Sequence, residues 1–335
     1  MNNGPATGGD LATGDACALD DLLSLSTPRL SAVVETVNIA PGQYTPLDCT
    51  LAQLEAQTIP KEQLEIIVVI DTAVHPALKK HVADLVPSAR IIETEGMHYY
   101  AQKNLGAAHA RAPLVGFIDS DCLPGITWAE SIIDAFARHD DRLGAVQGTV
   151  WTESDASIAK AFLVTVFGHL QAASERLTPS LATSNCAFRR ADIVASPFEE
   201  MPVFHGPDVR MRARLGDEGK YVLLVPGAAD RHAFEPELKP FLKHGVYWGY
   251  CFLNLRRDAR PSVPYARLFR RLGPLAPLAL VPAKAMIDLK RMFERRADLR
   301  LTPQQIVSCS AALLLNSLAV GYGAMLSVFR ITPSK

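Results

Sequence analysis

The stretch "APLVGFIDSDCLPG", Ala112 to Gly125, contains the pattern that decides the fold. Its apolar run, Leu114 to Ile118, is typical of a buried strand and is followed by two carboxylates one residue apart, Asp119 and Asp121. Alternate residues of a strand point to opposite faces, so a longer regular strand would place an unpaired carboxylate in the core, at a large free-energy cost. We therefore expect Asp119 to lie at the carboxyl end of the strand and Asp121 in the loop beyond it.

Strand and helix patterns alternate on both sides of this stretch. Runs typical of strands occur at 30–38, 64–71 and 90–93, and each is followed by residues at helical spacing, at 47–54, 75–85 and 100–112. Another helical pattern follows at 127–139. Repeated βα units predict an α/β fold, Rossmann-like, with a mostly parallel sheet flanked by helices. Ligands on such sheets bind beyond the carboxyl ends of the strands.

Three carboxylates are expected to meet at that edge. Asp71 ends the strand pattern at 64–71, so it joins Asp119 and Asp121. Their mutual repulsion calls for a cation, and hard oxygen ligands favour Mg²⁺ or Mn²⁺. The alternative is a pair of loop aspartates that cap the helix near Pro124, because Asp-x-Asp on its own is frequent by chance.

Composition is that of an ordinary globular protein. The 335 residues are 48% hydrophobic and 21% charged, which allows a substantial core. Residues 1–27 are rich in Gly, Ala and Asp and lack a long apolar run, so they are expected to form a disordered tail and not a signal peptide. Six cysteines are scattered without CxxC pairs, which argues against a zinc site or a disulfide framework and suits a reducing compartment.

The C-terminal region has a local charge and a long apolar run. Arg256 to Pro303 holds twelve Lys and Arg against four Asp and Glu, a local charge of +8 that leaves -9 for the rest of the chain. The following run, Ile306 to Phe329, is long enough to cross a bilayer, with the basic flank facing cytoplasmic lipid. A buried core helix behind a solvated basic linker explains the same pattern. Leu272 to Met286 is short and broken by prolines, which favours an interfacial or re-entrant segment.

Four blocks of the chain resemble the family 2 glycosyltransferases of GT-A fold. "YYAQKNLGAAHARAPLVGFIDSDCLPG" is similar to the family's Lys-Asn-x-Gly helix and Asp-x-Asp strand, and "SNCAFRR" (Ser184 to Arg190) to its Asn-x-Ala-x-Arg-Arg strand. "GPDVRMRARLGDEGKYVLLVPGAADRH" is similar to its acidic helix, the strand after it and a late histidine. The resemblance covers about Leu30 to Arg257, and the order of the blocks is more specific than any single motif.

The resemblance implies a role for each matching residue. Asp119 would contact the nucleotide ribose or the metal, Asp121 would hold the metal, His232 would approach the diphosphate or the metal, and Asp208 would be the general base. The expected nucleotide-binding residues are Thr36, Asn38, Asp71, Lys103, Asn104, Asp119 and Asn185, and the expected metal ligands are Asp119, Asp121 and His232. Structural alternatives remain for three residues: a solvated helix face for Lys103, a helix N-terminal carboxylate for Asp208 and a satisfied structural histidine for His232.

Departures from the family pattern limit these assignments. "IDTA" stands where the family has an Asp-Asp pair, so uridine cannot be assumed, and Pro207 replaces the acidic residue before the expected base. The Gln-x-x-Arg-Trp motif of processive synthases does not occur. The resemblance thus implies a metal-dependent inverting enzyme, of hexosyltransferase type and non-processive, that moves one sugar from a nucleotide-sugar donor to a hydroxyl of a glycan or a membrane-linked acceptor. Mn²⁺ or Mg²⁺ is the expected cofactor.

Two other functions are compatible with parts of the pattern. A haloacid-dehalogenase-like phosphatase also places Asp-x-Asp after a strand, although its loop normally continues with Thr or Val where Leu123 stands. A catalytically silent nucleotide-sugar-binding or scaffold protein is the second, because Thr72 and Pro207 fall inside functional blocks.

The expected organisation has three parts: a tail at 1–27, a GT-A domain at 28–257 and a basic, apolar helical region at 258–335. The expected location is the cytoplasmic side of a membrane, or otherwise the cytoplasm. No nucleic-acid partner is expected. The donor sugar, the acceptor and the oligomeric state stay open.

Overall fold

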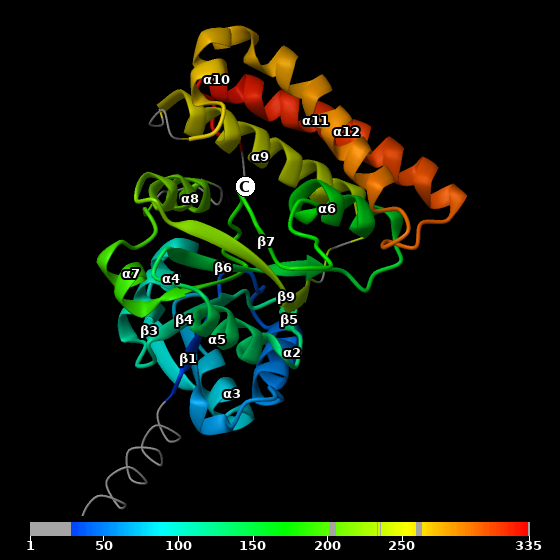
Figure 1. The fold of residues 1–335 in the computed structure, drawn as a ribbon. Helices are drawn as coiled ribbons and strands as arrows, with labels where there is room; N and C mark the ends of the chain where they lie inside the picture. Colours follow the sequence, from blue (N-terminus) through cyan, green and yellow to red (C-terminus); the bar gives the residue numbers. More distant parts are fainter. Residues whose placement is uncertain (1–27, 201–205, 233, 235, 259–262, 334–335) are drawn as a thin grey trace, which may run out of the picture.

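The computed structural model describes residues 28–200, 206–232, 234, 236–258 and 263–333. The tail expected at 1–27 lies outside the described residues. The first half of the chain builds a parallel sheet in the order β3-β2-β1-β4 (Figure 1). Its strands are β1 (Leu30–Glu35), β2 (Leu64–Asp71), β3 (Arg90–Thr94) and β4 (Leu114–Ile118), connected through η1 (Lys61–Gln63), α2 (Thr45–Glu55), α3 (Leu78–Leu85) and α4 (Tyr99–His109).

Antiparallel pairings enter beyond β4. There β8 (Asn185–Arg189) pairs antiparallel with β4 and with β6 (Leu143–Trp151), and β6 pairs parallel with β9 (Tyr221–His232). Two short strands, β5 (Cys122–Pro124) and β7 (Arg176–Leu177), pair antiparallel with β9. The predicted α/β fold is confirmed, and the expected parallel arrangement holds for β1 to β4 and for β6 with β9.

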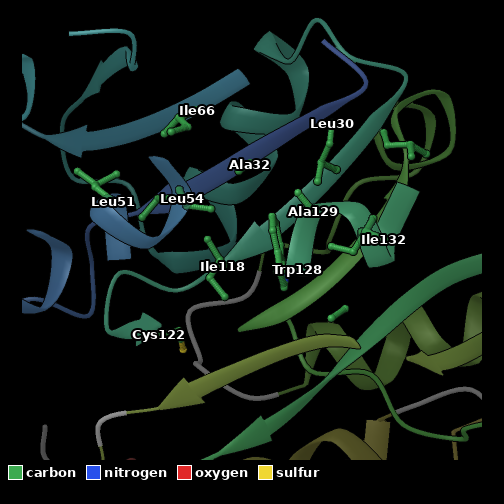
Figure 2. Packing of buried hydrophobic residues seen from close by; sticks show 14 of the residues in the cluster. Leu30, Ala32, Leu51, Leu54, Ile66, Ile118, Cys122, Trp128, Ala129 and Ile132 are labelled. Carbon is green, nitrogen blue, oxygen red and sulfur yellow. The ribbon is translucent and has the colours of Figure 1, made fainter. Parts of the chain in front are cut away.

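Helices cover both faces of the sheet because the strands are apolar on both sides. One core cluster joins the sheet to α2, α3 and α5 (Trp128–Arg138), and the other joins it to α4, α7 (Arg190–Ala195) and α8 (Pro207–Asp217). Trp128 is fully buried at the start of α5, in the same core cluster as Leu30 and Ile118 (Figure 2). Such burial on both faces explains why the strands appear in the sequence as continuous apolar runs.

Gly116 in β4 provides a direct test of this packing. A Cβ atom at Gly116 would lie 2.6 Å from Cη2 of Trp128, so an added methyl group must displace the indole ring. We expect Gly116→Ala to destabilise the protein by about 1–3 kcal/mol, measured by chemical denaturation. Gly125→Ala is the matched control, because its Cβ would make only an ordinary contact at 3.4 Å, and equal losses in the two variants would contradict the packing argument.

The remaining helices form a layer on the far side of α6 (Ser157–Phe167) and α8 (Figure 1). They are α9 (Leu238–Asp258), α10 (Ala266–Leu272), η2 (Gly273–Leu275), α11 (Ala276–Glu294) and α12 (Pro303–Val328). α12 begins at a capping box between Thr302 and Gln305. Within Leu272 to Met286, the expected interruption occurs at η2, between α10 and α11, whereas α11 continues through Pro282 without a break. The interfacial interpretation of this segment stays a prediction.

α9 and α12 pack backbone against backbone. A Cβ on Gly249 would lie 2.0 Å from the carbonyl oxygen of Val320, and one on Gly323 would lie 1.9 Å from that of Val246. α9 thus packs with the C-terminal helices, although the expected boundary at 257 would assign it to the catalytic domain. That boundary stays a prediction.

The outer surface of this layer is apolar. In the described part of the chain, two helical segments are long and apolar enough to cross a membrane, 266–294 and 303–328. α12 packs on α6 and α9, whereas large apolar side chains of η2, α11 and α12, and of Phe329 just beyond α12, are exposed: Leu275, Leu278, Met286, Phe293, Val307, Leu318, Tyr322 and Phe329. Toward α6, α11 carries the buried ion pair Lys284 to Asp288, bonded to Thr165.

Candidate functional site

Asp119 follows β4 at the carboxyl edge of the sheet and is only 5% exposed. Its Oδ1 accepts hydrogen bonds from Lys103 Nζ at 2.7 Å and from the Tyr99 hydroxyl at 2.7 Å. Its Oδ2 accepts from Asn38 Nδ2 at 3.1 Å. Two donors from α4 and one from the loop after β1 therefore compensate the buried charge of Asp119. The ion pair with Lys103 alone would leave part of the desolvation cost uncompensated.

Lys103 is completely buried in α4, so the interpretation of this residue as part of a solvated helix face is wrong. Its ammonium group also donates to the carbonyl oxygen of Thr183 at 3.1 Å. Burial opposes the charge, but the carboxylates of Asp119 and Glu35 outweigh it and raise the pKa of Lys103. Lys103 therefore stays charged and holds Asp119 ionised at the sheet edge.

Asp121 lies beside His232 because of a strand that the sequence pattern did not reveal. β5 pairs with the end of β9, with Cys122 opposite His232, and this brings His232 Nε2 to 3.8 Å from Asp121 Oδ2. Ligand atoms of Asp121, Cys122 and His232 all lie within 4.8 Å of one another. The Asp121 side chain remains 22% exposed, and burial raises its pKa. Of the three expected metal ligands, the structure brings Asp121 and His232 together, whereas Asp119 is bonded to Lys103, Tyr99 and Asn38.

The imidazole of His232 is held by aromatic stacking. Its ring lies 4.4 Å from that of Phe234 between centroids, with an interplanar angle of 3°. Phe167 of α6 packs nearby, with its ring centroid at 5.8 Å. Within the described residues, Nδ1 is buried without a hydrogen-bond partner. Stacking therefore fixes the ring plane while Nε2 faces Asp121.

Asp230 is a buried carboxylate that sequence reasoning missed. It is fully buried in β9, two residues before His232, and its Oδ1 accepts from Asn185 Nδ2 at 3.1 Å. Its Oδ2 has no partner among the described residues. Burial raises the pKa of Asp230 to about 7. The one feature of the sequence that could have indicated Asp230 is its position in a strand, two residues before His232.

Asn185 and Asn104 serve the scaffold. Asn185 is completely buried and accepts a hydrogen bond from Trp128 Nε1 at 2.8 Å, which ties β8 to α5. Asn104 is paired with the backbone of Phe198 through two hydrogen bonds. Asn185 also donates to Asp230, two residues before His232, whereas the side chain of Asn104 bonds the backbone of Phe198. The nucleotide contacts of both amides stay predictions.

Thr36 and Asp71 stand at the ends of the neighbouring strands, β1 and β2. The Thr36 hydroxyl donates to the carbonyl oxygen of Val69 at 3.0 Å and accepts from the amide of Asp71 at 3.4 Å. The Asp71 carboxylate accepts from the amides of Ala73 and Gly96, at 3.1 and 3.0 Å, and thereby organises two loops at this edge. These residues, with Asn38 and Asp119, lie along one sheet edge as predicted. The expected meeting of three carboxylates is not seen, because the group of converging ligand atoms among the described residues is Asp121, Cys122 and His232, without Asp71 or Asp119.

Glu35 is a second carboxylate that sequence reasoning missed. It is fully buried at the end of β1 and accepts from Val37 N at 2.5 Å and Asn38 Nδ2 at 3.0 Å. Burial, reinforced by the charge of Asp119, raises the pKa of Glu35 to about 8. Glu35 and Asp119 both accept from Asn38 Nδ2, so Glu35 orients Asn38 toward Asp119. A glutamate inside the run "VVETVN" is the signal that could have indicated it.

Asp208 lies apart from these groups, in the first turn of α8. Its Oδ1 accepts from the amides of Gly206 and Val209 at 3.1 and 2.9 Å, and burial raises its pKa. The two tyrosines that open α4 connect it to the cluster. Tyr99 donates to Asp119, and burial followed by the charge of Asp208 raises the pKa of Tyr100. The tyrosine pair is thus close enough to both carboxylates to feel their charges.

Comparisons with known proteins relate part of the chain to a family and its fold to solved structures. Residues 33–195 match the family model described as glycosyl transferase family 2. A search of the curated proteins found no match.

Among solved structures, one similar chain is a mannosyltransferase from Pyrobaculum calidifontis in complex with GDP-Man and Mn²⁺. The match has a TM-score of 0.54 and 19% identity, and it covers 87% of this chain and 86% of that one. Another is GalNAc-T7 with UDP, GalNAc and Mn²⁺, with a TM-score of 0.49 and 12% identity, covering 73% of this chain and 54% of that one. The match over residues 33–195 relates this part of the chain to the family 2 glycosyltransferases, and the chain has the GT-A fold.

Proposed function

We propose that the chain is a metal-dependent inverting enzyme that transfers one hexose from a nucleotide-sugar donor to an acceptor hydroxyl. The observation that carries this proposal is the separation of two carboxylate groups, Asp119 with Asp121 at the sheet edge and Asp208 at the start of α8. A displacement at the anomeric carbon requires two separate contributions from the enzyme. One stabilises the leaving group, and the other removes a proton from the attacking hydroxyl.

Asp121 and His232 are the residues that would hold Mn²⁺ or Mg²⁺. Their ligand atoms converge, Asp121 is accessible, and Asp230 leaves one carboxylate oxygen unpaired nearby among the described residues. The bound ion would neutralise negative charge on the departing nucleoside diphosphate. The mannosyltransferase with the same fold was solved with GDP-Man and Mn²⁺, which supports a nucleotide sugar and Mn²⁺ here.

Asp208 is the proposed general base. It accepts the proton of the acceptor hydroxyl while the new bond forms from that oxygen to the anomeric carbon and the bond to the diphosphate oxygen breaks. Attack opposite to the leaving group inverts the anomeric configuration. Burial raises the pKa of Asp208, which makes the carboxylate a stronger base than an exposed aspartate. A single transfer is proposed because the chain has no Gln-x-x-Arg-Trp motif.

Donor binding tests this function directly. We expect a nucleotide sugar or its nucleoside diphosphate to raise the melting temperature only with Mn²⁺ or Mg²⁺, since a ligand at about a hundredfold its Kd adds about 2.7 kcal/mol of stability. The measurement is a thermal-shift screen of nucleotides with and without the metal, followed by a transfer assay. Binding without turnover on any acceptor would favour the scaffold alternative. Release of phosphate from simple esters, without transfer, would favour the phosphatase.

The same proposal places the enzyme on the cytoplasmic side of a membrane, with a lipid-linked or glycan acceptor. The exposed apolar side chains of α11 and α12 supply the contact area, and Arg267, Arg270 and Arg271 of α10 supply positive charge beside it. α12 packs on α6 and α9 along one side, so the proposed contact is with the outer side of the layer.

Membrane association should depend on that outer side. We expect Leu318→Glu, at a side chain that is 60% exposed on α12, to shift the protein from the membrane to the soluble fraction after flotation. Val74→Glu is the matched control, because Val74 is 45% exposed and lies outside these helices. Recovery of the intact wild-type chain as a detergent-free soluble monomer would contradict the membrane proposal and leave the transferase proposal standing.

A further inference from the structure

A cavity of about 320 Å³ lies apart from the Asp121 cluster. It is formed where the end of α6, the segment after β7 and the end of α11 meet, and its lining includes His169, Thr178, Ser180 and Arg291. This volume lies at the lower end of the range for small-molecule sites. The segment that carries Thr178 and Ser180 continues to Thr183, whose carbonyl oxygen accepts from Lys103.

The walls of this cavity are positively charged. Arg176, Arg291 and Arg295 all line it, against one carboxylate, that of Glu294, which lies 3.8 Å from Lys290. His169 adds no charge, because burial and the neighbouring arginines lower its pKa to about 3. The cavity therefore carries an excess of positive charge in a partly enclosed space.

Hydrogen bonds within the protein occupy only part of the N–H donors of these three arginines. Arg295 is held by the carbonyl oxygen of Gln171 and by Asp298, and Arg176 donates to the carbonyl oxygen of His169. Within the described residues, the guanidinium of Arg291 makes a single polar contact, a 3.8 Å ion pair with Asp288. The Arg291 side chain is 31% exposed and lines the cavity, so its remaining N–H donors are open to a ligand or to water.

Neutral groups of the lining add further hydrogen-bonding capacity. Thr178 and Ser180 line the same cavity as the three arginines, and the Thr178 hydroxyl, which accepts from the amide of Ser180 at 3.2 Å, keeps its own O–H as a donor. His169 Nδ1 is buried, and no described residue is its partner. Planar guanidinium groups with nearby hydroxyls match the oxygens of a tetrahedral phosphate, whose bidentate pairing with arginine is among the strong hydrogen bonds of proteins.

We propose that this cavity is a second ligand site and binds a phosphate group. The group belongs either to a soluble phosphorylated compound or to the headgroup of an anionic lipid. The second source is compatible with the position of the cavity at the end of α11, whose exposed Met286 and Phe293 belong to the apolar outer surface. The proposal does not depend on glycosyl transfer, because binding at this site can be measured alone.

The test uses the full-length protein and inorganic phosphate in excess EDTA, which removes any metal-mediated binding at the Asp121 cluster. Phosphate affinity is measured by thermal shift and by calorimetry against chloride of equal ionic strength. Arg291→Gln removes the guanidinium with free donors, and Lys290→Gln, at an exposed side chain one residue away, is the matched control. Arg176→Gln is the second variant if Arg291→Gln fails to fold, as judged by circular dichroism.

We expect phosphate to stabilise wild type and Lys290→Gln alike, and Arg291→Gln to bind phosphate at least about tenfold more weakly. Equal affinity in the three proteins, or equal loss in both variants, would mean an adventitious ion only and would overturn the proposal. Flotation with vesicles of phosphatidylglycerol in phosphatidylcholine then separates the two sources. A selective loss of binding in Arg291→Gln, reversed in wild type by competing phosphate, indicates a headgroup. Unchanged flotation with lost phosphate binding indicates a soluble ligand.

Discussion

Asp121→Ala is expected to remove nearly all transfer activity and to leave the fold intact. The Asp121 side chain is 22% exposed and lies 3.8 Å from Nε2 of His232, so its loss leaves no buried lysine or arginine without its partner among the described residues. If it holds the metal ion on the donor diphosphate, its removal costs several kcal/mol of transition-state stabilisation, or at least about a hundredfold in rate. Transfer assays with saturating donor and Mn²⁺ measure the loss, and the metal-dependent thermal shift should disappear with it.

Asp134→Ala on α5 is the matched control, since it removes an exposed carboxylate outside the site. Its activity should equal that of wild type. Full turnover of wild-type protein in excess EDTA would refute the metal assignment, whatever the variant does. Loss of folding in Asp121→Ala would show that the carboxylate stabilises the β5 to β9 pairing and would leave its catalytic role to be tested with Asp121→Asn.

Asp208→Asn is expected to lower kcat by at least about a hundredfold with donor affinity nearly unchanged. The amide keeps the shape of the side chain, and its oxygen can still accept from Gly206 and Val209, so the start of α8 should stay folded. The amide cannot take the acceptor proton. Steady-state kinetics with a titration of donor by calorimetry separates the two effects.

The pH profile gives a second readout for Asp208. A base works only when deprotonated, so wild-type kcat should fall as the pH drops through the pKa of Asp208, which burial raises above the ordinary value for aspartate. That acidic limb should be absent from the residual activity of Asp208→Asn. Asp217→Asn, at the exposed end of the same helix, should keep both rate and profile. A variant that loses donor affinity and keeps kcat would make Asp208 a pocket or capping residue.

The residues at the carboxyl edge of the sheet can be predicted from the sequence because they are indicated by local patterns of neighbouring residues. Apolar runs end at Asp71 and Asp119, and residues at the carboxyl ends of parallel strands must share an edge, as β2, β1 and β4 confirm. The helix at 303–328 is likewise indicated by local features, its long apolar run and the capping box between Thr302 and Gln305.

Non-local contacts account for what the sequence did not reveal. Lys103 looks like a solvated helix residue until α4 is placed on the sheet, where Asp119 and Thr183 become its partners. β5 is three residues long and forms only against the end of β9, so neither the pairing nor the meeting of Asp121 with His232 is visible in periodicity. Pro282 predicted a break in α11, but flanking turns and packing on α6 and α12 sustain the helix around the missing donor.

The close contact between α9 and α12 has a consequence for recognising this architecture in other sequences. Gly245 and Gly249 lie one turn apart on α9 and face α12, where Gly323 faces back, and a methyl group at any of the three would clash with atoms of the opposite helix. A chain that keeps this crossing must therefore keep residues without a Cβ at these positions. The spacing "GVYWG" followed some seventy residues later by "GYG" is a signature that hydropathy does not provide, and it can distinguish chains with this helical layer from those that carry the catalytic domain alone.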